Sequence, residues 1–207
     1  MTLDFDLLKR LIEQAVTEIE NEYKQSQGLI LTEGDLKCLL YSRLIQNNEL
    51  SQRMLTQNHG IYAKPVHSEL SWYDENNKLS ILPDITIIKP ENLSILSGHP
   101  GDPKLPNLPS KQYRFRGSAI IFELKFIRNK TGITPKTFSG AIEKDFLKIK
   151  RLHDKLFSQG VADEMFCYFI IFNKTDKKCQ EFERFFTQDS QSDWHKVIYC
   201  TGDVRFH

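Results

Sequence analysis

The sequence lacks the features that mark membrane, secreted and zinc-bound proteins. No apolar run approaches the roughly 20 residues that a membrane-spanning helix needs. Charged residues, among them Asp4, Asp6 and Lys9, interrupt the N-terminal segment, so it is not predicted to be a signal peptide. The four cysteines stand far apart and form no C-x-x-C pair. These absences predict a reduced, cytoplasmic protein without structural zinc and without a membrane partner.

The composition is that of an ordinary folded domain. Of the 207 residues, 40% are apolar and 27% are charged, which is enough for one hydrophobic core. The sequence shows no internal repeat and no low-complexity stretch. We therefore expect residues 1–207 to form a single domain.

The net charge of +1 conceals an uneven distribution. Residues 111–155 contain 12 Lys or Arg against four Asp or Glu, an excess of eight positive charges, and the rest of the chain carries an excess of seven negative charges. A concentrated basic segment on a nearly neutral protein favours a local phosphate-binding face. The alternative interpretation is a set of solvated lysines on helix surfaces.

Apolar periodicity predicts four helices and five strands. Helices are expected at residues 5–23, from 32 onward, at 141–157 and at 180–186, and strands at 62–73, 79–89, 118–127, 165–172 and 197–200. Thr32 is expected to cap the second helix together with Asp35. The order α-α-β-β-β-α-β-α-β predicts an α/β fold with a central sheet flanked by helices and with residues 1–28 as an N-terminal helical extension.

Residues 90–116 interrupt this pattern. Five prolines and two glycines between positions 90 and 109 disfavour a helix or a central strand, so a long inserted loop is predicted. Loops of this length inside a compact domain are usually functional or mobile. One hypothesis makes this segment a protein-docking loop in a larger assembly.

Three charged residues stand in apolar strands that would normally exclude them. Asp84 follows Pro83 within an apolar run, and Glu123 and Lys125 lie on one face of the AIIFELKF strand because strand side chains alternate. A buried carboxylate is usually neutralised, paired or bound to a metal, and two converging carboxylates suit a hard divalent cation. The alternative is a same-face Glu123–Lys125 ion pair with Asp84 as a turn or edge acid.

Pro83-Asp84, followed on the next strand by Glu123-Leu124-Lys125, resembles the motif of the PD-(D/E)xK nuclease superfamily, which includes restriction endonucleases and Holliday junction resolvases. The likeness covers residues 32–173 and extends to the expected αβββαβ core, with a mixed sheet between helices. It implies a divalent-metal-dependent nuclease that hydrolyses phosphodiester bonds of nucleic acid, with DNA as the expected substrate.

The resemblance assigns roles to individual residues. Asp84 and Glu123 would bind Mg²⁺ or, in its place, Mn²⁺, with the carbonyl of Leu124 as a further ligand. Lys125 would orient the attacking water and stabilise charge on the transition state. Glu33, expected to point from the second helix toward the sheet, corresponds to a helix-borne glutamate that supports the metal cluster; interaction with the helix dipole is the alternative.

Further residues are candidates for support and for substrate binding. Glu69 resembles an acid near the active site, and a position on a solvated strand face is the alternative; Asp145 is expected to hold Lys125 or Lys148. The predicted contacts to nucleic acid are Lys148, Arg151, Arg114 and Arg116. Cleavage of both strands of a duplex would require two sites and hence a homodimer. A catalytically silent nuclease-like module for DNA binding or protein assembly is the alternative function.

Overall fold

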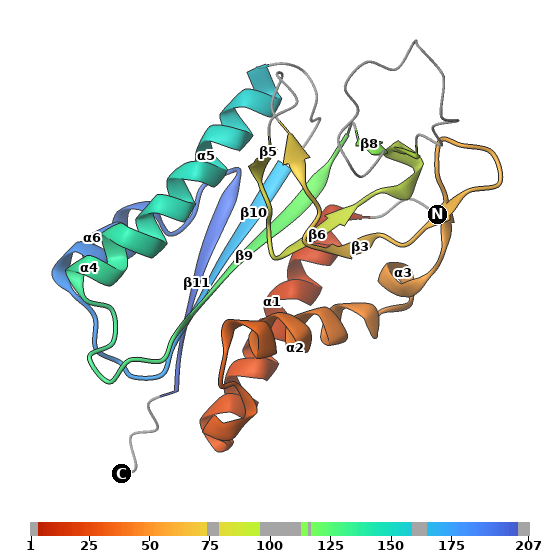
Figure 1. Cartoon of the computed structure of the whole chain (residues 1–207). Helices are drawn as coiled ribbons and strands as arrows, with labels where there is room; N and C mark the ends of the chain where they lie inside the picture. The colour runs from red at the N-terminus through yellow and green to blue at the C-terminus, as the bar shows by residue number, and fades with distance from the viewer. Residues whose placement is uncertain (1–3, 74–78, 96–112, 116, 159–164, 203–207) are drawn as a thin grey trace.

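A mixed five-stranded sheet forms the centre of the structure, a computed structural model that describes residues 4–73, 79–95, 113–115, 117–158 and 165–202. The strand order is β11-β10-β9-β6-β3 (Figure 1). Its strands are β3 (Val66–Ser68), β6 (Ile85–Ile88), β9 (Ala119–Ile127), β10 (Met165–Asn173) and β11 (His195–Thr201). The last three are parallel, whereas β6 runs antiparallel to β9 and β3 antiparallel to β6.

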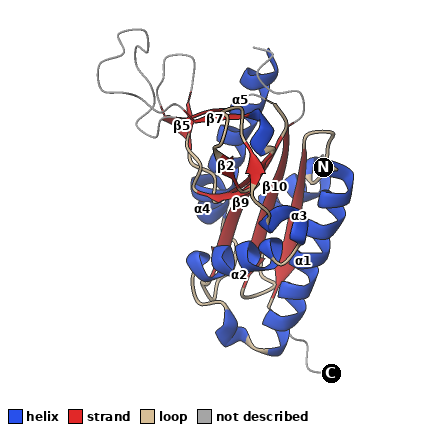
Figure 2. Ribbon diagram, turned by 90° about the vertical axis from the view of Figure 1, so that its right-hand side faces the viewer, coloured by secondary structure: helices blue, strands red, loops and turns tan. Residues whose placement is uncertain are grey.

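Helices cover both faces of this sheet. Along β9, Ile120, Phe122 and Leu124 pack toward one group of helices, whereas Ala119 and Ile121 pack toward the other. The first group is α1 (Phe5–Gln25), α2 (Glu33–Ile45) and α3 (Asn48–Ser51), seen together on one side of the sheet in Figure 2. The second comprises α4 (Pro135–Thr137), the π-type turn η3 (Phe138–Ile142), α5 (Glu143–Ser158) and α6 (Gln180–Asp189). No helix in the described ranges combines the length and apolar character needed to cross a bilayer.

Local side-chain hydrogen bonds fix the start of α2. The Thr32 hydroxyl accepts from the N–H of Asp35 at 3.1 Å, and the Asp35 carboxylate accepts from the N–H of Thr32 at 2.9 Å. This reciprocal cap satisfies N–H groups that have no partner within the helix, and it confirms the predicted capping pair. Glu33 is thereby held as the first residue of the helix.

The two long strands predicted at 62–73 and 79–89 are each divided, which corrects the sequence prediction. The first contains β2 (Tyr62–Ala63), β3 and β4 (Trp72–Tyr73), and the second contains β5 (Leu79–Ile81) and β6. Pro65 precedes β3, and Pro83 lies in the break before β6. Proline has no N–H to donate to a strand ladder, so both prolines disfavour a continuous strand.

The predicted loop 90–116 contains regular secondary structure in both of its described parts. It begins with the short helix η2 (Pro90–Asn92), and β7 (Leu93–Ile95) pairs with β8 (Tyr113–Phe115) in an antiparallel ribbon. Leu93 packs into the core. Residues 96–112, on which the docking-loop hypothesis mainly depends, lie outside the described residues. The short α3 and the pair of β1 (Met54–Leu55) with β2 were not predicted either.

Candidate functional site

The candidate site forms where β9 extends beyond its neighbour β6. These strands pair only from Ala119 to Phe122 on β9, so the rest of β9 runs on past the end of β6 (Figure 1). Asp84 stands at this divergence. Its N–H donates to the Phe122 carbonyl at 3.0 Å, and its Oδ2 accepts from the N–H of Leu124 at 2.9 Å. The break before β6 therefore places the Asp84 carboxylate against the edge of β9.

A second carboxylate binds the next N–H along this edge. Glu33, at the start of α2, accepts from the N–H of Phe126 at 3.3 Å through Oε2. Because the N–H and C=O of a strand residue point to the same side, the carbonyls of Leu124 and Phe126 face this edge as well. The Leu124 carbonyl thus lies on the edge that holds Asp84.

Glu123 and Lys125 project from β9 toward α5. Their side chains are only 12% and 13% exposed, and Lys125 Nζ lies 2.8 Å from Glu123 Oε1. The same ammonium lies 3.0 Å from Asp145 Oδ2 on α5 and 4.0 Å from Glu33 Oε1 on α2. Lys125 therefore joins acids from both helical layers and from its own strand.

Lys37 is a member of the site that the sequence analysis missed. Its Nζ lies 2.6 Å from Glu69 Oε1 and 3.8 Å from Asp84 Oδ1. Lys37 stands four residues after Glu33 on α2, so the two side chains share a helix face. That spacing was the only sequence signal for Lys37, because its contact with Asp84 joins elements distant in the chain.

Together these residues form a group with an excess of negative charge, which we call the site cluster. It comprises five acids and three lysines, namely Glu33, Glu69, Asp84, Glu123, Asp145, Lys37, Lys125 and Lys148. With every group ionised, the site cluster carries two more negative than positive charges. A single divalent cation would balance this excess.

Burial and mutual repulsion alter the titration of the acids. Burial raises the pKa of Glu123 to about 7; Lys125 opposes this rise, and Asp84 and Asp145 add to it. Burial also raises the pKa of Glu33, in spite of the nearby Lys125. Both shifts mean that ionisation of all the acids at once is unfavourable in the metal-free folded protein.

The surroundings of Lys125 stabilise its charged form. Burial lowers the pKa of Lys125, but Glu123, Glu33 and Asp145 outweigh burial and hold it above its ordinary value. For Asp145, burial raises the pKa, but the hydrogen bonds from Lys148 and Lys125 outweigh burial and hold the pKa below its ordinary value. Lys125 is therefore an ammonium group that can donate hydrogen bonds and stabilise negative charge, and in this arrangement it is not a base.

The available donors fit a hard divalent cation with few protein ligands. Within the described part of the chain, no group of three or more His, Cys, Asp or Glu side chains lies close enough together to hold a metal ion. The available donors are instead the Asp84 carboxylate and the Leu124 carbonyl at the edge of β9, and the Glu123 carboxylate, which interacts electrostatically with Asp84. Mg²⁺ typically binds one or two carboxylates and keeps several waters, so this oxygen set is suitable for it.

The remaining predicted residues differ in their relation to the site. Asp145 contacts both lysines that the sequence proposed for it, since Lys148 Nζ lies 2.8 Å from its Oδ1. Lys148 is half-exposed at the rim of the site cluster, and Arg151 lies on the exposed surface of α5. Arg116 and the side chain of Arg114 lie outside the described residues.

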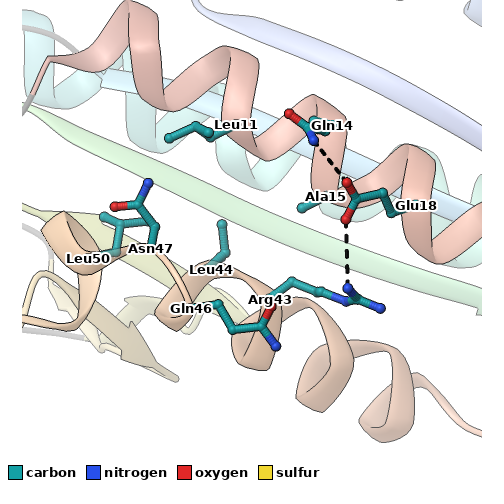
Figure 3. A pocket seen from close by; sticks show the side chains of 9 residues that line it. All are labelled: Leu11, Gln14, Ala15, Glu18, Arg43, Leu44, Gln46, Asn47 and Leu50. Carbon is teal, nitrogen blue, oxygen red and sulfur yellow. Dashed lines mark hydrogen bonds and ion pairs between the residues drawn. The ribbon is translucent and has the colours of Figure 1, made fainter.

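A second charged contact lies in the groove between α1 and α2, the α1–α2 groove (Figure 3). Arg43 of α2 lies 3.7 Å from Glu18 on α1 and also binds Glu22. Gln14 donates to Glu18 at 2.9 Å. The groove is lined by Leu11, Gln14, Ala15, Glu18, Arg43, Leu44, Gln46, Asn47 and Leu50. Its charged side chains are partly exposed and link two helices.

The sequence matches no protein-family model, and no curated protein or solved structure is significantly similar to it. The function proposed below is therefore inferred from the residues and geometry of the site cluster.

Proposed function

We propose that this protein is a divalent-metal-dependent nuclease that hydrolyses phosphodiester bonds, with DNA as its expected substrate and a core of the PD-(D/E)xK, restriction endonuclease-like type. The observation that carries the proposal is the position of the Asp84 carboxylate against the edge of β9, where it interacts electrostatically with Glu123, the partner of Lys125. The excess of acid in this half-buried position supports a cation site better than a purely structural ion-pair network. A structural network is expected to balance its charges.

Each residue has a chemical role in this proposal. Asp84, Glu123 and the Leu124 carbonyl would hold Mg²⁺ or Mn²⁺, which when bound activates water and polarises the phosphoryl oxygen. The Lys125 ammonium would donate hydrogen bonds to the phosphoryl oxygens, on which negative charge develops in the transition state. Asp145 and Glu33 keep Lys125 directed at the site. The oxygen of water bonds to phosphorus as one P–O ester bond breaks, and the proton that the water loses ends on the leaving oxygen.

The cations at the rim of the site favour a polyanionic substrate. Lys148 lies beside Asp145, and Lys144 and Arg151 occupy the same side of α5 at helical spacing, all exposed. Such a line of cations suits a sugar–phosphate backbone, whose binding weakens as salt concentration rises. These three residues belong to the basic segment 111–155, and in the proposed complex they would form one wall of the site.

Cleavage assays on plasmid, linear and branched DNA with Mg²⁺ or Mn²⁺ test the proposal. We expect the wild type to cleave at least one substrate, and the Asp84→Asn, Glu123→Gln and Lys125→Met variants to lose that activity. Lys196→Met is the matched control, because Lys196 also binds a carboxylate on another element, Glu13 at 2.8 Å, but outside the site cluster. Equal activity in the wild type and the site variants would contradict the proposal.

A non-catalytic DNA-binding module predicts a different set of results. It would bind DNA in a salt-sensitive manner, would cleave no substrate, and would show no metal binding that depends on Asp84. Calorimetric titration of Mn²⁺ into the wild type and Asp84→Asn separates the two functions without any need for the correct substrate.

A further inference from the structure

Lys37 lies between two carboxylates that it contacts unequally. Its ammonium forms a short ion pair with Glu69 at 2.6 Å, whereas Asp84 Oδ1 is 3.8 Å away, beyond hydrogen-bond distance. The other oxygen of Asp84, Oδ2, accepts from the N–H of Leu124. Oδ1 is therefore the oxygen that Lys37 would bind if its ion pair with Glu69 were lost.

The backbone at Glu69 is held in an unusual conformation. Glu69 has a φ of 54° and is the one non-glycine residue with positive φ in the described part of the chain. Left-handed conformations cost free energy for residues with a side chain and persist where the surroundings impose them. Here the Glu69 N–H donates to the carbonyl of Asp84 at 3.2 Å. The turn after β3 is thereby attached to the same residue whose carboxylate faces Lys37.

A lysine close to a metal-binding carboxylate has two opposite effects. It can hold the carboxylate in place, but its positive charge also competes with a metal ion for the same oxygen. The position of Lys37 decides between the two effects, and the ion pair with Glu69 sets that position. Lys37 is largely buried, with 21% of its side chain exposed, so it has limited freedom to turn toward solvent instead.

We propose that Glu69 is a positioning residue that binds Lys37 and so keeps Asp84 Oδ1 free for the metal ion. In this arrangement Glu69 acts through Lys37 and is not itself a metal ligand. The inference rests on the proposed metal site and adds to it a means of control, because any change that releases Lys37 from Glu69 weakens metal binding at Asp84.

Calorimetric titration of Mn²⁺ into the metal-free protein tests this inference in a double-mutant cycle, at a pH above the pKa of Glu123. Glu69→Gln should lower the affinity for Mn²⁺ by about tenfold, a usual effect of losing a group that orients a ligand. Lys37→Met should leave the affinity unchanged or increase it. In the Lys37→Met background, Glu69→Gln should change the affinity by less than about twofold, because the competing ammonium is absent.

Glu22→Gln is the matched control, because Glu22 binds Arg43, six residues beyond Lys37 on the same helix. Its affinity for Mn²⁺ should equal that of the wild type. An equal loss from Glu69→Gln with and without Lys37 would make Glu69 a direct contributor to metal binding and would overturn the inference. Unchanged affinity in Glu69→Gln would also overturn it and leave the proposed metal site intact. A wild type that binds no Mn²⁺ overturns both.

Discussion

The two ends of α2 take part in two charged contacts that differ in burial and in charge balance. Its first turns supply Glu33 and Lys37 to the site cluster, where five acids share three lysines and several side chains are almost buried. Its last turn supplies Arg43 to the α1–α2 groove, where partly exposed glutamates bind one arginine and a glutamine donates to Glu18.

Under the proposed function, this difference separates a contact that serves the fold from one that serves a ligand. Exposed ion pairs are screened by water, so a charge mismatch there has a small effect on stability. An excess of like charge in a buried position destabilises the folded state and is retained where a ligand or reaction requires it. The site cluster should therefore respond strongly to charge changes, pH and metal, and the α1–α2 groove should respond to none of them strongly.

The largest effect is expected from Lys125→Met. This variant removes the ammonium that links Glu123, Asp145 and Glu33, and it leaves buried carboxylates without their counter-charge. Loss of one partner of a buried ion pair destabilises by about 3 kcal/mol or more. Urea denaturation at a pH above the pKa of Glu123 measures this loss. Stability equal to the wild type would show that the site cluster is as weakly coupled as the groove.

A smaller effect is expected from pH in the metal-free protein. The folded pKa of Glu123, about 7, lies above its ordinary value of 4.5, so between these values the folded state binds the proton more tightly. Its contribution to stability is therefore present below the unfolded pKa and is lost as pH rises through about 7. The loss is at most about 3 kcal/mol by linkage.

Glu123→Gln isolates this contribution from other titrating groups. Lys125, Asp84 and Asp145 face Glu123 at the site cluster, and the buried Cys167 on β10 interacts with it electrostatically. Burial holds the pKa of the Cys167 thiol well above its ordinary value, so the thiol stays neutral over this range. The difference in unfolding free energy between the wild type and Glu123→Gln should shrink as pH falls from 8 to 5. A constant difference would contradict the assignment.

Metal binding should then stabilise the wild type by a moderate amount. Mg²⁺ at about ten times its Kd adds about 1.4 kcal/mol of stability, which corresponds to a Tm increase of about 3–5 °C for a domain of this size. Asp84→Asn should show no such increase, although its amide oxygen can still accept from the N–H of Leu124. Thermal denaturation monitored by circular dichroism measures both proteins, and an equal shift in the two would place the metal elsewhere.

The smallest effect is expected from Arg43→Met in the α1–α2 groove. Its ion pairs with Glu18 and Glu22 are partly exposed and screened by water, so the loss should remain below about 1 kcal/mol. DNA cleavage and Mn²⁺ affinity should equal those of the wild type. A larger loss than that of Lys125→Met would reverse the comparison between the two ends of α2.

The sequence predicted those elements whose apolar pattern is long and regular. The helix at 5–23, the strands β9 and β10, and the cap of α2 at Thr32 and Asp35 are confirmed within a few residues. The break before Asp84 was missed because the apolar residues continue through Leu82. Pro83 was the available signal, since a proline in an apparent central strand argues against an unbroken strand.

Within the site, the sequence could place residues on a common strand but could not place one element against another. Glu123 and Lys125 share a face by strand alternation, and Glu33 was correctly directed toward the sheet. The contact of Lys37 with Asp84 depends on how α2 packs against β9 and β3. The left-handed turn at Glu69 depends on its bond to Asp84. Neither feature has a local pattern in the chain.

A crystal structure grown with Mn²⁺ tests the central claim most directly. The account predicts one anomalous scattering peak at the open edge of β9, within bonding distance of the side-chain oxygens of Asp84 and Glu123 and the main-chain oxygen of Leu124. A crystal grown with saturating Mn²⁺ that shows no peak at that edge, and in which Glu123 pairs with Lys125 alone, would contradict it.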